Sequence, residues 1–283
     1  MSSSDSPTKL TPASLTDAAF EAVRTLAFDR LGVTLADAKR ELVYTRISRR
    51  LRKLKLDTFE EYIELVRSGD PDEAQEFINA ITTNLTSFFR EPHHFEFLGQ
   101  TLLPRLMQEK KASRKIRIWC SAASTGQEPY SIAATVREAV PDLSGWDLKI
   151  LATDIDTNVL DTARRGLYSE ENVRDMDKGV LRRWFLRGKG SNAGKVKAHP
   201  ALQELISFKR LNLLDPWPMA GPFDVIFCRN VMIYFDKPTQ AKILVKFAQV
   251  QRTGMHLLMG HAENITRITE DYKLVGQTIY RRT

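Results

Sequence analysis

The sequence predicts an α/β domain built on an open sheet, preceded by a small all-α domain. Residues 14–83 show only helical periodicity, whereas strand-length apolar runs alternate with helices further along the chain. An alternating apolar run over residues 116–120 leads through small residues into a helix near Pro129, and the next strand, 148–153, ends at Asp154. In open α/β sheets, an acidic side chain at the end of the second strand can bind ribose hydroxyls. The pattern therefore indicates a ligand site at the carboxyl ends of the strands.

Composition places the chain among ordinary globular proteins, with 42% hydrophobic and 27% charged residues in a length of 283. No apolar run approaches the ~20 residues of a membrane span, and the first residues lack the apolar segment of a signal peptide. We therefore expect a cytoplasmic protein. The two cysteines, Cys120 and Cys228, exclude a disulfide framework and a cysteine-based zinc site, and both are expected at the ends of buried strands.

The net charge of +7 is concentrated in one segment. Residues 39–55 contain eight lysines and arginines against a single acid, Glu41, and this segment alone carries a charge of +7. The rest of the chain is neutral overall, so the basicity belongs to one patch.

The N-terminal part is interpreted as a helical domain over residues 14–83, after a Ser/Thr/Pro-rich stretch, 1–13, that is expected to be disordered. Helices are expected over residues 16–31, 37–54, 58–67 and 72–83. On the second of these, apolar side chains fall on one face and cations on the other. Such a helix presents its cationic face to solvent or to a partner.

The segment TNLTSFFREPHHFEFL, residues 83–98, combines polar, aromatic and cationic side chains ahead of the first strand. Its aromatic residues can anchor it while the polar groups point elsewhere, so it is either an element that covers a ligand or an ordinary interdomain helix. His93, His94 and Glu96 raise the question of a metal. Adjacent histidines point in different directions on a helix and no further ligand is suitably spaced, so no metal site is expected.

The alternation of strands and helices continues with a helix over residues 158–165 and is then interrupted by residues 181–210. This stretch holds three short strand candidates, over 184–187, 195–199 and 205–209, and a glycine-rich loop joins the first two. We therefore expect a small antiparallel insertion at residues 181–210.

A buried strand over residues 223–228 ends at Arg229 and Asn230, and Tyr234 follows in the next loop. These side chains are expected at the ligand edge of the sheet. We interpret His261, at the end of a later strand, as a polar strand-end residue rather than a catalytic base. The remaining elements are expected over residues 238–250, 255–259 and 272–281.

Five stretches, in order along the chain, resemble the chemotaxis receptor methyltransferases, the CheR family of glutamate O-methyltransferases. They are TTNLTSFFRE, AASTGQEPYS, ATDID, NLL and FCRNVMIYF. The resemblance extends from the basic helix to the C-terminus. One departure is Gln127, where the family pattern has a glutamate. The acid that follows it in the pattern, Glu128, is present.

The resemblance implies a class I methyltransferase fold with a mostly parallel, seven-stranded sheet over residues 84–283, and S-adenosylmethionine as cofactor. Asp154 would take the ribose hydroxyls, Glu128 the cofactor's ammonium group or sulfonium field, and Asn212 and Leu213 the adenine. The full set of implied cofactor residues is Asn84, Thr86, Arg90, Glu128, Asp154, Asn212, Leu213, Arg229 and Asn230.

The implied reaction is methyl transfer to glutamate side chains of methyl-accepting chemotaxis receptors, which yields methyl esters and S-adenosylhomocysteine. A carboxylate with a pKa near ~4.3 is already ionised at neutral pH, so no general base is required. Positioning and desolvation of the nucleophile then carry the catalysis, and Arg90 and Tyr234 are expected to orient it.

The resemblance also gives the N-terminal domain a receptor-recognition role, with Arg46, Arg49, Arg50 and Lys53 docking the acidic methylation region of the receptor. The insertion resembles an element that binds a C-terminal receptor peptide by adding a strand. No nucleic acid and no membrane insertion are expected, and a monomer is the default. Cys120 and Cys228 are expected to touch without forming a disulfide.

Three other classes remain as alternatives. The basic patch would suit an RNA or DNA methyltransferase, but it lies on a separate helical domain and no amine-methylating motif is present. A non-catalytic, cofactor-binding adaptor is disfavoured by the presence of Arg90, Asp154 and Tyr234. A nicotinamide dehydrogenase is disfavoured because the loop before Pro129 holds a single glycine, Gly126.

Overall fold

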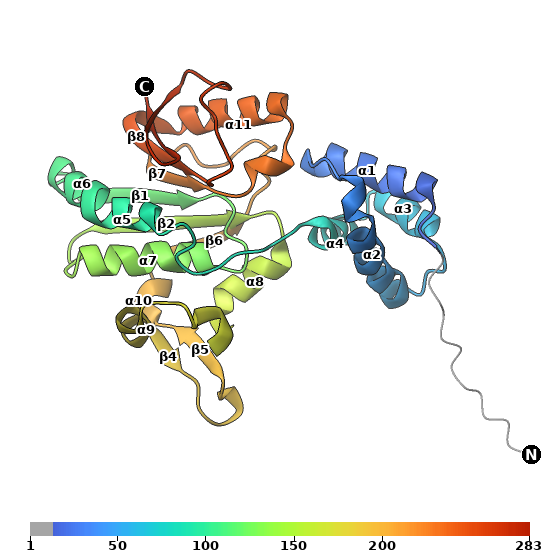
Figure 1. Ribbon diagram of the computed structural model, residues 1–283, viewed down its shortest axis with the longest axis horizontal. Helices are drawn as coiled ribbons and strands as arrows, with labels where there is room; N and C mark the ends of the chain where they lie inside the picture. Colours follow the sequence, from blue (N-terminus) through green and yellow to red (C-terminus); the bar gives the residue numbers. More distant parts are fainter. Residues whose placement is uncertain (1–13) are drawn as a thin grey trace, which may run out of the picture. The chain divides into compact units, whose positions relative to one another are not determined.

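The computed structural model describes residues 14–283, so the expectation for residues 1–13 lies outside it. The chain forms two compact units, one ending at Thr82 and the other beginning at Thr83 (Figure 1). Among the described residues, no helix combines the length and apolarity needed to cross a membrane.

The first unit is all-helical, with α1 (Asp17–Leu31), α2 (Arg40–Leu54), α3 (Phe59–Arg67) and α4 (Pro71–Ile81). Each boundary follows from local chemistry. Thr16 caps α1 by accepting the Ala19 N–H at 3.0 Å, and Gly32 ends it in the left-handed conformation. Thr58 and Glu61 form a capping box at α3. The helices enclose a core of Phe20, Val23, Ile47, Leu51, Phe59, Tyr62 and Phe77.

The second unit contains the seven-stranded sheet that the resemblance implied, in the order β6-β2-β1-β7-β8-β10-β9. The first five strands in this order are parallel, and β10 is antiparallel to both β8 and β9. The strands are β1 (Lys115–Cys120), β2 (Asp147–Asp154), β6 (Ile206–Arg210), β7 (Phe223–Cys228), β8 (Gln251–Met259), β9 (Tyr272–Gly276) and β10 (Ile279–Arg282). Every residue of β7 is buried, as expected for a central strand.

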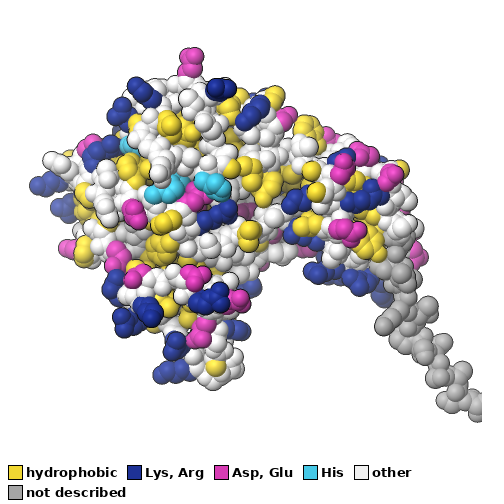
Figure 2. Space-filling view, in the orientation of Figure 1, with side chains coloured by type: hydrophobic (Ala, Val, Ile, Leu, Met, Phe, Trp, Pro, Cys, Tyr) yellow, Lys and Arg dark blue, Asp and Glu magenta, His cyan; other side chains and the backbone are white. Residues whose placement is uncertain are grey.

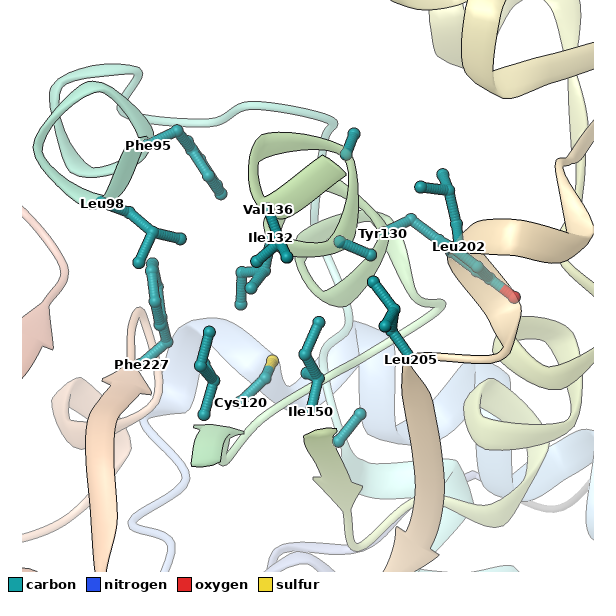
Figure 3. Packing of buried hydrophobic residues seen from close by; sticks show 14 of the residues in the cluster. Phe95, Leu98, Cys120, Tyr130, Ile132, Val136, Ile150, Leu202, Leu205 and Phe227 are labelled. Carbon is teal, nitrogen blue, oxygen red and sulfur yellow. The ribbon is translucent and has the colours of Figure 1, made fainter. Parts of the chain in front are cut away.

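Helices cover both faces of this sheet, with α7 (Gln127–Ala139) and α11 (Lys237–Gln249) on opposite sides (Figure 1). Figure 3 shows α7 side chains such as Tyr130 and Ile132 directed toward the strand residues Cys120, Ile150 and Phe227. The other helices of this sheet are α5 (His93–Glu96), the π-helical η2 (Phe97–Leu102), α6 (Leu103–Glu109) and α8 (Thr157–Arg165).

The expected contact between the two cysteines is wrong, although their strands are neighbours. The parallel register pairs Cys120 with Phe227, so Cys228 is one residue further along β7. Successive side chains of a strand point to opposite faces. Cys120 accordingly packs in the core beneath α7 and Cys228 in the core beneath α11, and both thiols are free.

A three-stranded antiparallel sheet accompanies the main sheet, in the order β3-β5-β4. Its strands are β3 (Leu167–Ser169), β4 (Phe185–Arg187) and β5 (Lys195–Ala198), and around them lie η3 (Glu170–Val173), α9 (Lys178–Trp184), η4 (Gly190–Asn192) and α10 (Pro200–Gln203). A Cβ at Gly188 would lie 2.0 Å from the Asn192 carbonyl oxygen, so the tight β4–β5 loop requires glycine there.

The extent of the insertion differs from the expectation of residues 181–210. The third strand candidate, 205–209, does not join the small sheet. It forms β6 at the edge of the main sheet, parallel to β2 and with Ile206 opposite Ile150, while β3 supplies the third small strand. A five-residue alternating strand fits either sheet equally well, so its periodicity could not identify its partner.

Candidate functional site

The site lies where β1, β2 and β7 end side by side. Because these strands are parallel, their carboxyl ends share one edge of the sheet. Backbone hydrogen bonds hold the loop after β1 to both neighbours: the Ser121 N–H donates to the Phe227 carbonyl at 2.9 Å, and the Ala123 N–H to the Thr153 carbonyl at 2.8 Å. The small residues of this loop therefore allow it to lie flat against the strand ends.

Asp154 is held rigidly at this edge. Its Oδ2 accepts the Ser124 N–H at 2.7 Å and its Oδ1 accepts the Asp156 N–H at 3.0 Å. The residue is buried, and within residues 14–283 it forms no ion pair. Burial raises the pKa of Asp154 to about 6, against the backbone hydrogen bonds that favour the ionised form. An ionised carboxylate offers about four acceptor sites, so Asp154 can still accept a hydroxyl donor.

Arg229 forms the centre of a buried charge cluster. Its Nη1 lies 2.7 Å from Glu128 Oε2 and its Nη2 lies 3.2 Å from Glu91 Oε2. Nη2 also donates to the Arg90 carbonyl, and the guanidinium lies 5.6 Å from the centre of the Phe95 ring. The cluster of two carboxylates and one guanidinium therefore has a net charge of −1 when both acids are ionised.

Glu128, from the first turn of α7, is held by two groups. Its Oε2 accepts from Arg229, and its Oε1 accepts the Cys120 thiol at 3.2 Å. Burial raises the pKa of Glu128, while the Arg229 charge opposes this rise.

Sequence reasoning missed Glu91, which the structure places among the expected site residues. Its Oε1 receives His261 Nδ1 at 3.0 Å and Asn230 Nδ2 at 3.4 Å, and its Oε2 faces Arg229. The signal was present as the acid in FFRE, directly after Arg90. Burial raises the pKa of Glu91, but the hydrogen bond from His261 and the charge of Arg229 outweigh it and lower the pKa to about 2.

The segment before α5 is not a helix, so the interdomain-helix interpretation is wrong. Non-glycine residues with positive φ, Phe89 at 50° and Glu91 at 58°, prevent regular structure. Phe88 packs edge-on against Tyr168 and Phe185, with ring centroids 4.9 and 5.2 Å apart. The Phe89 N–H donates to Ser131 Oγ at 2.9 Å. The aromatic residues thus anchor the segment on the second unit.

Asn84 of the same segment binds the loops after β1 and β2. The Asn84 carbonyl accepts Ser124 Oγ at 3.0 Å, and its amide Nδ2 donates to Asp156 Oδ2 at 2.8 Å. Arg90 is half-buried and donates from Nη1 to the Leu85 carbonyl at 3.2 Å. Thr86 is half-buried beside the exposed Leu85.

Asn212 and Leu213 follow β6, next to Asp154. The Leu211 N–H donates to the Asp154 carbonyl at 2.9 Å, which fixes the start of this loop. Asn212 Oδ1 accepts the Leu214 N–H at 3.0 Å, so the amide shapes its own turn, while the Leu213 side chain is buried.

Asn230 and Tyr234 lie in the loop after β7. Asn230 has a φ of 57°, and Tyr234 ends a short 3-10 turn, η5 (Met232–Tyr234), with its side chain half-buried. His261 is largely exposed and bonds to Glu91 rather than standing alone at its strand end.

The expectation that no third ligand lies near the adjacent histidines is wrong. Ligand atoms of Glu91, His93 and His94 lie within 4.8 Å of one another. Glu91 precedes the helix, so helical spacing did not reveal it. The Arg229 guanidinium already supplies a cation 3.2 Å from Glu91, which disfavours a metal ion in the same place.

The four cations expected to dock a receptor divide into two pairs. Arg50 is inside the helical unit, with Nη2 2.5 Å from Glu73 Oε2 and Nη1 3.0 Å from Glu76 Oε2. Arg46 donates to the Ala80 carbonyl at 3.1 Å and to the Thr82 carbonyl. Arg49 and Lys53 are exposed on α2, and Figure 2 shows Lys and Arg side chains gathered along α2.

The residues at the strand edge fit S-adenosylmethionine. Asp154 is a fixed carboxylate with no cationic partner in the described part of the chain, suited to ribose hydroxyls, and Glu128 adds a second carboxylate for an ammonium group. Both carboxylates already lie at the strand edge, so neither role requires a change in the backbone.

Comparisons with known proteins agree with this geometry. The model for the CheR methyltransferase all-alpha domain matches residues 18–82, and the model for the CheR methyltransferase SAM binding domain matches residues 84–281. The chain is 47% identical to Chemotaxis protein methyltransferase 2 of Pseudomonas aeruginosa, over 92% of this chain and 91% of that protein. It is 44% identical to the chemotaxis protein methyltransferase of Escherichia coli, over 94% and 91%. With both domains matched in order, and with the carboxylate geometry of the strand edge suited to the cofactor, the chain belongs to the CheR methyltransferase family.

Proposed function

We propose that this S-adenosylmethionine-dependent chemotaxis methyltransferase esterifies receptor glutamates at the edge where β1, β2 and β7 end. The observation that carries this proposal is the convergence there of Asp154, the Glu128–Arg229 pair and the segment that ends in Arg90. S-adenosylmethionine, when bound, supplies an electrophilic methyl group.

Within this site, Asp154 and Glu128 hold the cofactor, and Asn212 and Leu213 border its adenine. Asn84, Thr86 and Asn230 complete the enclosure, and Arg229 keeps Glu128 and the Arg90 backbone in place through its buried hydrogen bonds. These assignments extend the family resemblance to the positions that the strand edge brings together.

The incoming glutamate is ionised at neutral pH, so this chain needs only to position and desolvate it. Arg90 suits that task because its guanidinium is held by one backbone carbonyl and by no carboxylate in the described part of the chain. A loosely held guanidinium can orient the carboxylate without lowering its nucleophilicity. The Tyr234 hydroxyl supplies a second polar contact to the same carboxylate.

The decisive experiment transfers radiolabelled methyl from S-adenosylmethionine to purified receptor. We expect label on the receptor that mild base releases as methanol, the signature of a carboxyl ester. Base-stable label would indicate methylation of an amine instead, and label on added RNA or DNA would contradict the proposal. Cofactor binding without any transfer would indicate an adaptor.

We further propose that Arg49 and Lys53 on α2 attract the acidic methylation region of the receptor, on the cytoplasmic side of the membrane. Both are exposed, and residues 39–55 around them carry a net charge of +7. Arg46 and Arg50 support this face from inside the helical unit rather than contacting the receptor.

The three-stranded sheet is proposed to hold a receptor tail. In the order β3-β5-β4, the strand β4 is at an edge, and its Leu186 is about half exposed. An extended peptide can pair with such an edge. Titration of a Trp- and Phe-containing receptor tail peptide into the protein, which we expect to behave as a monomer, should give saturable binding, and no binding would rule out the peptide site.

A further inference from the structure

Glu263 is a buried carboxylate that none of the assigned roles uses. It lies in the turn after β8, where its own N–H donates to the Gly260 carbonyl at 2.9 Å. Strand β8 is the neighbour of β7, with Cys228 opposite Met259, so this turn lies against the loop that follows β7.

Four backbone N–H groups converge on this one carboxylate. Oε2 accepts from Gly260 at 2.6 Å and from Asn230 at 2.9 Å. Oε1 accepts from Met232 at 2.7 Å and from Ile233 at 3.4 Å. Three of the four donors belong to the loop that carries Asn230 and Tyr234.

Only a carboxylate can satisfy this arrangement. An ionised carboxyl group offers about four lone pairs on two oxygens, whereas an amide of the same shape has one oxygen and would turn an NH₂ group toward two of the donors. Glu263 forms no ion pair within residues 14–283. Burial raises its pKa, and the four N–H groups oppose this rise by solvating the ionised form.

The turn and the loop also fit each other sterically. A Cβ on Gly260 would lie 2.5 Å from Asn230 Nδ2, 2.8 Å from Asn230 N and 2.7 Å from Glu263 Oε2. Asn230 itself has a φ of 57°, which a side-chain-bearing residue keeps only when its surroundings enforce it. The side-chain amide of Asn230 is held as well, because its Nδ2 donates to Glu91 Oε1 at 3.4 Å.

We infer that Glu263 is a positioning residue for methyl transfer. By binding the N–H groups of Asn230, Met232 and Ile233, it fixes the backbone from which the Asn230 amide and the Tyr234 ring project. It touches neither cofactor nor substrate in this role. The inference rests on the proposed function for the roles of Asn230 and Tyr234.

The test compares Glu263→Gln with a matched control, Asp224→Asn. Asp224 is likewise a buried acid, on β7, the strand that neighbours β8, and it accepts the Arg117 N–H at 2.8 Å beside Lys110. It lies at the start of the strand, away from the carboxyl edge. Both variants should lower Tm, but only Glu263→Gln should lower kcat per folded molecule, by roughly 10²-fold, the cost of small misplacements of reacting groups.

A spectroscopic readout separates positioning from stability. With 3-fluorotyrosine incorporated and the resonance of Tyr234 assigned by Tyr234→Phe, Glu263→Gln should shift or broaden that resonance and Asp224→Asn should leave it in place. If Glu263→Gln does not fold, Gly260→Ala displaces the same loop without removing the carboxylate and should produce the same change.

An unmoved Tyr234 resonance, or equal kcat values for the two folded variants, would overturn the inference. The proposed function is judged separately, because the unsubstituted enzyme must esterify receptor glutamates whatever these variants do.

Discussion

Asp154 shows how one buried carboxylate is kept available for a ligand at a cost in stability. Backbone N–H groups, among them those of Ser124 and Asp156, orient it, yet it forms no ion pair within residues 14–283, and burial raises its pKa to about 6. Because this value is above the ~3.9 of an unfolded aspartate, the folded state binds the proton more tightly. The contribution of Asp154 to stability therefore falls as the pH rises from about 4 to about 6.

The ionised form is the one that can accept two ribose hydroxyls, so cofactor affinity should decrease as the pH falls through about 6. Calorimetric titration of S-adenosylhomocysteine between about pH 5 and about pH 8 measures this. Asp154→Asn should bind weakly at every pH, without a step, and should unfold at no lower temperature than the unsubstituted protein at pH 7. Since the pKa of Glu128 is also raised, this variant identifies which acid titrates. Affinity independent of pH would contradict the assignment.

Arg90 is expected to act on the nucleophile more than on the cofactor, because within residues 14–283 its guanidinium donates only to the Leu85 carbonyl. Arg90→Ala should lower kcat by about 10²-fold. The dissociation constant of S-adenosylhomocysteine should change by much less, about threefold. Arg90→Lys, which keeps the charge but loses the planar fork, is the matched variant and should recover part of the turnover. An unchanged kcat would remove Arg90 from the mechanism.

Helix α2 separates two kinds of cation that its sequence pattern does not distinguish. Arg50 is 12% and Glu73 7% exposed, and together they form a largely buried ion pair, whereas Arg49 and Lys53 stand in solvent. The Arg50–Glu73 ion pair holds α2 to α4, whereas Arg49 and Lys53 remain available to a partner.

Arg50→Ala should destabilise the helical unit by about 3 kcal/mol, since it leaves the Glu73 carboxylate buried without its partner. Thermal unfolding followed by circular dichroism measures the loss. Arg49→Ala serves as the control and should change stability by less than about 0.5 kcal/mol, because Arg49 is exposed. Equal effects of the two substitutions would contradict this division.

The segment 83–92 is a second case in which the sequence pattern did not determine the local structure. Its alternation of aromatic and polar residues predicted the anchoring of Phe88 and Phe89 correctly but left open a helix. Positive φ at Phe89 and Glu91 decided against the helix, and such angles depend on contacts that the segment makes elsewhere, such as the Phe89 hydrogen bond to Ser131.

At the scale of the whole molecule, the positive charge is concentrated in short segments rather than in one unit, since residues 1–82 hold 12 Lys and Arg against 14 Asp and Glu and residues 83–283 hold 30 against 21. A net charge of +7 resides in residues 39–55, and the remainder of the chain is neutral.

Receptor methylation should therefore fall steeply with added salt, while the affinity for S-adenosylhomocysteine changes little. The double charge reversal Arg49→Glu, Lys53→Glu should raise the apparent KM for receptor by about tenfold at low salt and abolish most of the salt dependence. Initial rates with receptor in membranes at several ionic strengths measure both effects. Salt-independent methylation would show that the patch serves another purpose.

The sequence by itself determined the helical character of the first unit, the strand end at Asp154 and the family, because hydrophobic periodicity, caps and short motifs are local properties of the chain. Only the tertiary structure decided that β6 joins the main sheet, that Cys120 and Cys228 face opposite sides, and that Arg50 is inside the helical unit. It also brought Glu91 to Arg229 and Glu263 to the loop after β7. Strand partners and buried charge pairs depend on where distant segments meet, and in this protein residues more than 100 positions apart in the chain, such as Glu91 and Arg229, complete one site.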